Sequence, residues 1–177
     1  SFEASLQTAG ARGYRATAQT GLNPNGTYVK INIDTAATNE NRFGMLNTST
    51  YRITIPKSDF YDIKALLRIA GTNVIATEYQ VVVFKNGSLF IEGERQRIPS
   101  SGPSFALSLS DTRYLLENEY LELYFFSTGD HSSSTLSTVA SSGQSNFLSV
   151  QARPNFSVLG AYSDGGTGLV CEAHYPA

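Results

Sequence analysis

Hydrophobic residues recur along this chain at every second position, which is the period of β-strands. Between residues 28 and 33, Val29, Ile31 and Ile33 alternate with Lys30 and Asn32. Further segments that alternate, or are short and apolar, are 51–55, 80–84, 89–91, 104–109, 147–152 and 156–162. Clusters of turn-forming residues separate these segments, a pattern typical of a β-sandwich or barrel.

Residues 60–70 fit two kinds of element. An amphipathic helix capped by Ser58 or Asp59 is one, and a strand with one apolar face is the other. The helical spacing involves Ile63, Leu66, Leu67 and Ala70, whereas the strand spacing involves Tyr61, Ile63, Ala65, Leu67 and Ile69. Because strands are expected on both sides, we predict a strand here.

The segment 119–126 has two apolar faces. Leu121, Leu123 and Phe125 share one face. The residues on the opposite face are Tyr120, Glu122, Tyr124 and Phe126. A sheet in a lone domain usually has one solvated face, so we predict that a neighbouring subunit covers the second. The alternative is cover by a loop or the C-terminal extension of the same chain. A buried Glu122 needs a hydrogen-bond donor.

Two further segments predict turns and loops. Asn86-Gly87 follows the apolar run 80–84 and is a strong hairpin signal, because both residues tolerate positive φ. Residues 127–144 are rich in Ser, Thr and Gly, so we expect a long mobile loop.

The order of short motifs along the chain is informative. They are a strand at 27–34, a loop with Asn39, Asn41, Phe43 and Gly44, YRITIP at 51–56, Phe60-Tyr61, VVFKNG at 82–87, a strand at 105–109, ENEYLEL at 117–123 and NFLS at 146–149. This succession resembles the C1q/TNF-like jelly roll, and the opening Ser1-Phe2-Glu3-Ala4 is similar to the first strand of that family. The resemblance covers residues 1 to about 153.

Several positions depart from the family pattern. Asp59-Phe60 stands where the family has Gly before its Tyr, and Glu117-Asn118 stands in place of Gly-Asp. The family's terminal Phe-x-Gly is here Phe147-Leu148-Ser149. These departures indicate a remote member, closer to the heads of bacteriophage and bacterial fibres than to animal complement proteins.

The resemblance implies an all-β fold, a two-sheet antiparallel jelly-roll sandwich that assembles as a homotrimer. We expect a head domain over 1–153 and a C-terminal strand or extension over 154–177. The predicted trimer interface consists of Tyr120, Glu122, Tyr124 and Phe126.

Composition bounds the function. A chain of 177 residues fits one domain with a substantial core. Its net charge of -2 offers no electrostatic footprint for nucleic acid or an anionic membrane. No apolar run reaches the length of a membrane span, and no signal peptide is recognisable. Cys171 is the single cysteine, which excludes an internal disulfide framework.

Catalytic and metal-binding signals are weak. Asp130, His131 and Ser132 are adjacent, whereas a catalytic triad converges from separate segments, so we expect His131 to be an exposed loop residue. Cys171 and His174 are a remote nucleophile–base candidate. Asp34, Asn39, Glu40 and Asn41 offer oxygen ligands, and some C1q-like domains hold calcium. They lack the spacing of a calcium loop, so we predict neither a metal site nor a cofactor.

We therefore predict a non-enzymatic trimeric attachment head of a phage or bacterial fibre, extracellular or on a virion or cell-surface appendage. Its partner would be a cell-surface glycan or protein receptor. Candidate ligand-binding residues are Asp130, His131, Asn86 and Tyr14. Two alternatives are a structural decoration or cement protein of a virion and a secreted C1q/TNF-like ligand for a protein receptor.

Overall fold

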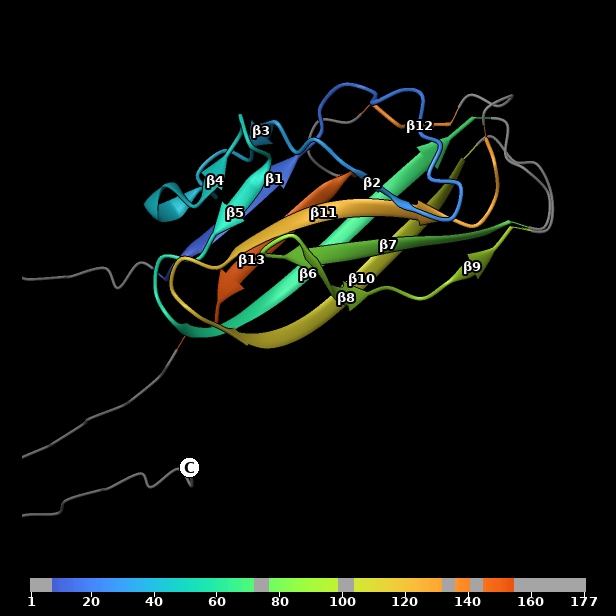
Figure 1. Ribbon diagram of the computed structural model, residues 1–177. Coiled ribbons are helices and arrows are strands. Elements are labelled where there is room, and N and C mark those ends of the chain that lie inside the picture. The colour runs from blue at the N-terminus through green and yellow to red at the C-terminus, as the bar shows by residue number, and fades with distance from the viewer. Residues whose placement is uncertain (1–7, 72–76, 99–103, 132–135, 141–144, 155–177) are drawn as a thin grey trace, which may run out of the picture.

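A computed structural model describes residues 8–71, 77–98, 104–131, 136–140 and 145–154. Their strands form two antiparallel sheets that lie face to face (Figure 1). Sheet A has the order β10-β6-β13-β1-β3, with β12 also paired to β6. Sheet B has the order β4-β5-β11-β7-β8, with β2 paired to β11 and β9 to β7. The predicted two-sheet antiparallel sandwich is thereby confirmed.

The strands differ widely in length. Sheet A consists of β1 (Gly10–Tyr14), β3 (Thr35–Ala36), β6 (Asp59–Ala70), β10 (Ser104–Leu115), β12 (Ser137–Thr138) and β13 (Phe147–Ala152). Sheet B consists of β2 (Tyr28–Lys30), β4 (Leu46–Asn47), β5 (Arg52–Thr54), β7 (Glu78–Lys85), β8 (Ser88–Glu92), β9 (Gln96–Arg97) and β11 (Tyr120–Ser127). A short 3-10 turn, Arg42–Gly44, precedes β4.

The ambiguous segment 60–70 is a strand, as predicted. It forms β6, which pairs with β10 on one side and with β13 on the other. Tyr61, Ile63, Ala65, Leu67 and Ile69 are buried, while the residues that alternate with them face outward. The neighbouring strands decide the conformation, because an extended segment here completes the hydrogen bonding of both.

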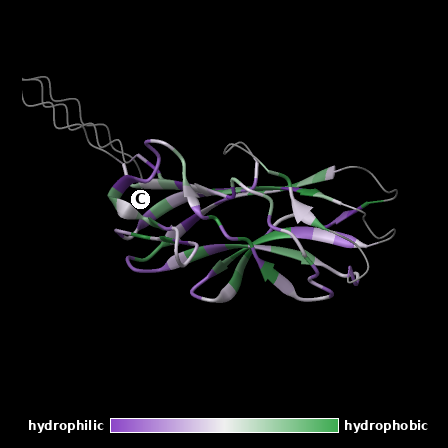
Figure 2. Cartoon of the chain, turned by 90° about the horizontal axis from the view of Figure 1, so that it is seen from above, coloured by the Kyte–Doolittle hydropathy of each residue, from purple (hydrophilic) through white to green (hydrophobic). Residues whose placement is uncertain are grey.

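The core lies between the two sheets. Hydrophobic and hydrophilic residues alternate along the strands (Figure 2), as expected when one face of each sheet is buried. The fully buried side chains include Tyr61, Ile63, Leu67, Val81, Leu107, Leu123, Phe125 and Leu148.

The turn at Asn86-Gly87 is the predicted hairpin between β7 and β8, and both residues have positive φ, 52° and 81°. Within the residues that the structure describes, the prediction of a loop throughout 127–144 is wrong at its start, where Ser127 ends β11, and at residues 136–138. Leu136 is fully buried, and β12 extends sheet A. Leu136 thus brings this otherwise polar segment into contact with the core.

The last strand that the structure describes, β13, ends at Ala152, near the predicted domain boundary. The division into 1–153 and 154–177 stays a prediction. The predicted strand 156–162 lies outside the described residues. No helix within the described ranges has the length and apolar character needed to cross a membrane.

Candidate functional site

Strand β11 has the two faces that its sequence predicted. Leu121, Leu123 and Phe125 are fully buried in the core. On the outward face Glu122 is 2% exposed and Phe126 is 7% exposed. A single chain therefore already covers much of this face. The cover comes from neighbouring strands of sheet B, and the predicted subunit interface at this face stays a prediction.

Aromatic side chains provide part of the cover. The ring of Phe84 lies 4.2 Å from that of Tyr124 and 5.1 Å from that of Tyr28. Tyr28 in turn lies 5.2 Å from Phe126, and the guanidinium of Arg95 lies 5.2 Å from the centre of the Phe126 ring. The ring pairs join strands of one sheet, and the cation–π contact comes from the connection between β8 and β9.

Ionic contacts provide the rest. Glu122 Oε1 accepts hydrogen bonds from Lys30 Nζ at 2.6 Å and from Arg52 Nε at 2.8 Å. The hydroxyl of Tyr124 donates to Glu122 Oε2 at 3.5 Å. We call Lys30, Arg52, Glu122 and Tyr124 the Glu122 cluster. The carboxylate thus has the donors that its burial requires.

The electrostatics of the Glu122 cluster favour an ionised carboxylate. Burial opposes ionisation, but the hydrogen bonds and charges of Lys30 and Arg52 outweigh it and hold the pKa of Glu122 below its ordinary value. The same hydrogen bond raises the pKa of Arg52. Tyr124 has a raised pKa because it is partly buried and lies near the Glu122 charge.

Strand register explains why these residues meet. Lys30 on β2 pairs directly with Tyr124 on β11, two residues after Glu122. On the same side of β11, Ile53 of β5 pairs with Leu121, which places Arg52 beside Glu122. The cluster therefore joins β2 and β5 to the central strand of sheet B.

The four predicted ligand-binding residues do not form one site. Asn86 is exposed at the β7–β8 turn, where its Oδ1 accepts a hydrogen bond from the backbone N–H of Tyr120 at 3.0 Å. Asp130 and His131 follow the other end of β11, roughly 24 Å away for a strand of this length. Tyr14 belongs to sheet A, where it pairs with Phe147.

The prediction that His131 is an exposed loop residue is wrong. Its side chain is 1% exposed and its ring stacks on Tyr79 with 5.6 Å between ring centres. Its backbone N–H donates to Asn23 Oδ1 at 2.7 Å, and Asn23 Nδ2 donates to Asp130 Oδ1 at 3.0 Å. The aromatic stack overrides the polar composition of the segment. Burial lowers the pKa of His131, partly opposed by the charge of Asp130.

The outward face of sheet A carries exposed aromatic residues that the sequence analysis did not single out. Phe60 on β6 and Tyr114 on β10 are each 53% exposed, and their rings meet edge to face at 5.2 Å. Their sequence signal is the strand period, because each lies next to one core residue, Tyr61 or Leu115, and so faces outward.

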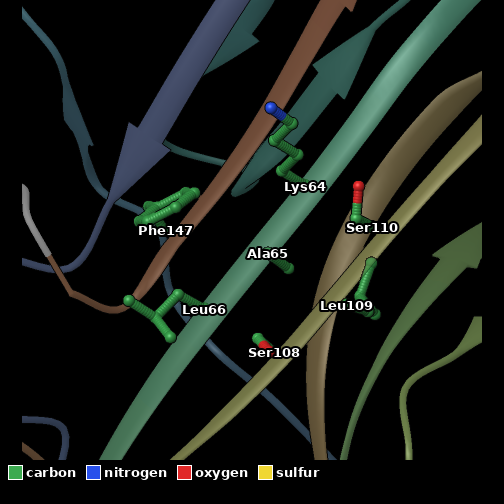
Figure 3. Close-up of a pocket in the computed structure, with 7 residues that line it drawn as sticks. All are labelled: Lys64, Ala65, Leu66, Ser108, Leu109, Ser110 and Phe147. Carbon is green, nitrogen blue, oxygen red and sulfur yellow. The ribbon is translucent and has the colours of Figure 1, made fainter.

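A shallow hollow lies on the same two strands and β13 (Figure 3). Its volume is about 430 Å³, and its lining residues are Lys64, Ala65, Leu66, Ser108, Leu109, Ser110 and Phe147. We call this hollow, together with Phe60 and Tyr114, the sheet A face. It combines apolar rings with small side chains.

The oxygen-bearing residues considered for calcium have other contacts. Asp34 forms an ion pair with Arg15, and Asn41 Oδ1 accepts a hydrogen bond from the N–H of Leu46 at 2.8 Å. Among the described residues, no three His, Cys, Asp or Glu side chains lie together as a metal site would require. Cys171 and His174 lie outside the described residues.

No protein-family model matches the sequence, and no curated protein matches it. Solved structures do match. Eiger TNF from S. frugiperda superposes with a TM-score of 0.60 at 11% identity, covering 92% of this chain and 99% of the other. The structure of murine APRIL at pH 5.0 superposes with a TM-score of 0.57 at 9% identity, and that at pH 8.5 with a TM-score of 0.55 at 7% identity. Each match covers 83% of this chain and 100% of the APRIL chain. The strand order and these matches agree, and the chain has the fold of a C1q/TNF-like jelly roll.

Proposed function

We propose that this chain is a non-enzymatic binding head that self-associates as a homotrimer and recognises a ligand on a cell surface. The observation that carries the proposal is the sheet A face, where an exposed aromatic pair and a hollow lie on the outside of a C1q/TNF-like jelly roll. Exposed aromatic rings on a surface are typical of sites that bind another protein.

The sheet A face is a better subunit interface than the outward face of β11 that the sequence predicted. On β11 the buried groups already have partners, and Lys30 and Arg52 bring two positive charges against one carboxylate. Covering these charges would require further desolvation. Phe60 and Tyr114, by contrast, are large apolar rings that gain from burial.

We assign the head to the tip of a phage or bacterial fibre, where it works outside the cell. Sequence departures from the animal members of the family support this assignment, as does a chain with only 16% charged residues. A trimer built on sheet A leaves sheet B and the loops that flank β11 exposed to a ligand. Asn86 and Asp130 are exposed on that side.

A second candidate function is that of a secreted ligand for a protein receptor. The observation in its favour is that Eiger TNF and murine APRIL share the fold over nearly their whole lengths. A virion decoration protein is the third candidate, in which the trimer binds a capsid lattice.

Light scattering coupled to gel filtration tests the assembly, and we expect three times the mass of the 177-residue chain. A monomer at micromolar concentration would contradict the proposal. Binding of labelled trimer to whole bacterial cells then tests attachment. A trimer that binds no cells but decorates capsids would transfer the function to the virion, and one that binds only a soluble receptor ectodomain would favour the secreted ligand.

A further inference from the structure

The Glu122 cluster has one more positive charge than its carboxylate balances. Lys30 and Arg52 both donate to the same oxygen, Glu122 Oε1. The carboxylate just before β11, that of Glu119, forms its own ion pair with Lys85 at 2.8 Å. The excess charge lies on an outward face, where the Lys30 side chain is 27% exposed and that of Arg52 is 39% exposed.

Arg52 is held in place as a binding group. Its Nε donates to Glu122, and its guanidinium carbon lies 4.0 Å from the centre of the Tyr120 ring. Among the residues that the structure describes, neither terminal nitrogen of Arg52 has a hydrogen-bond acceptor. A guanidinium fixed by one nitrogen and stacked on a ring presents the other two as a planar fork, which fits a carboxylate with two parallel hydrogen bonds.

The groups around this fork are polar and adapted to hydroxyl groups. Asn86 holds the backbone of Tyr120 through two hydrogen bonds, because its backbone N–H donates to Tyr120 O and its side-chain Oδ1 accepts from Tyr120 N–H. The phenol oxygen of Tyr120 lies beside Gly87 at the same turn. An amide and a phenol next to a cationic fork match a sugar that carries both hydroxyl groups and a carboxylate.

Backbone strain marks the other side of the cluster. Tyr51 has a φ of 58°, a left-handed conformation that a residue with a bulky side chain rarely adopts. Its ring lies 5.8 Å from Lys30 Nζ, which also donates to Thr50 O at 2.8 Å. The strained turn thus fixes the second cation, as Tyr120 fixes the first.

We propose that the outward face of sheet B around Arg52 is a binding site for a carboxylated saccharide of the sialic acid or uronic acid class. Arg52 binds the carboxylate with its two terminal nitrogens, while Tyr120 and Asn86 contact the sugar hydroxyl groups. Lys30 holds Glu122 ionised and so keeps Arg52 in position. This inference rests on the proposed function, since it names the ligand class of the attachment head.

Titration of the full chain with sialyllactose, followed by NMR or calorimetry, tests the site. We expect saturable binding with shifts centred on Arg52 and Tyr120, and no saturation with lactose, which lacks the carboxylate. Arg52→Gln should weaken binding at least tenfold. Arg52→Lys, which keeps the charge without the fork, should weaken it less.

Arg95→Gln is the matched control. It removes an equal charge from the connection between β8 and β9 of the same sheet, at a residue that pairs with Glu78 at 3.4 Å. We expect unchanged affinity for this variant. The proposal would be overturned if the chain bound sialyllactose and lactose with equal affinity. It would also be overturned if Arg52→Gln left the affinity for sialyllactose unchanged, or if Arg95→Gln lowered it as much as Arg52→Gln does.

Two further outcomes distinguish an acidic saccharide from a protein ligand, and this inference from the proposed function. An acidic glutamate peptide that displaces sialyllactose at lower concentration would assign the fork to a protein ligand and overturn the saccharide. If the trimer binds cells but does not bind acidic sugars, this inference is overturned and the proposed function stays in place. Circular dichroism of each variant shows whether a loss of binding reflects a loss of fold.

Discussion

Lys30 Nζ lies 2.6 Å from Glu122 Oε1, across the boundary between β2 and β11, and the carboxylate is 2% exposed. Such a contact stabilises the fold mainly because its absence would leave a buried charge short of donors. It also ties β2, a strand of only three residues, to the centre of sheet B.

We expect Lys30→Met to lower the free energy of unfolding by about 1–3 kcal/mol, because Glu122 would keep only Arg52 as a charged partner. Urea denaturation measures the change. Lys57→Met is the control, since Lys57 is exposed and its side chain has no hydrogen bond within the described residues. Equal midpoints for the two variants would show that the ion pair contributes nothing to stability.

His131 predicts a loss of stability in mild acid. Its folded-state pKa lies below the ordinary value of 6.5, because burial disfavours the imidazolium. The unfolded chain therefore binds the proton more readily, so stability is fully present above pH 6.5 and falls as the pH drops towards the folded-state pKa. Urea midpoints measured across this range give the dependence.

His131→Phe separates this effect from other titrations. The substitution keeps an aromatic ring against Tyr79 and removes the titrating group. We expect the acid dependence just below pH 6.5 to flatten in the variant. The same slope in both proteins would mean that another group is responsible.

The sheet A face makes a prediction about assembly. Phe60→Ser combined with Tyr114→Ser should shift gel filtration from trimer towards monomer, because both rings would lose the apolar contact that burial provides. Both residues are exposed in the single chain, so the fold should tolerate the changes.

Tyr124→Ala is the comparison, because the sequence pattern predicts that this change weakens assembly more than any loop substitution does. With the interface on the sheet A face, the variant should remain trimeric. Dissociation of Tyr124→Ala, with the double serine variant still trimeric, would return the interface to the outward face of β11.

A side chain at position 93 should create a packing defect where sheets A and B approach each other. A Cβ at this position would lie 2.9 Å from Val81 O and 3.0 Å from Ser108 O, both of which are backbone atoms. Because backbone in two sheets must move, we expect Gly93→Ala to cost about 1–3 kcal/mol of unfolding free energy. The neighbouring Glu94→Ala, at an exposed residue, should change the urea midpoint little. Equal midpoints would show that the sheets can separate at this point without cost.

The fold could be predicted because strands and turns leave local patterns in the sequence, and because these patterns occur in a characteristic order along the chain. The period-two pattern identified the strands with both faces specified, such as Leu121 against Glu122, and Asn86-Gly87 fixed a hairpin. The family resemblance indicated that the strands form a two-sheet antiparallel jelly roll, which periodicity alone does not specify. The short strands β1, β3, β4, β9 and β12 were missed, because segments of two to five residues carry too few alternations to detect.

The candidate site was less accessible to sequence reasoning. Arg52 and Lys30 are separated from Glu122 by 70 and 92 residues, so their meeting depends on strand register and cannot be read from spacing. Sequence did indicate that Glu122 needs a donor, although not which one. His131 was misjudged because its neighbours are polar, whereas the aromatic ring that buries it, Tyr79, lies on β7.

His131 and Leu136 are both buried, and they bracket the four residues 132–135. Each is tied to a separate part of the fold, His131 through Tyr79 and Asn23, and Leu136 through its carbonyl, which accepts a hydrogen bond from the N–H of Leu22. A sequence inserted between two such anchors has little effect on the elements outside them. Changes in the length of the chain between these two anchors should therefore leave the two sheets in place.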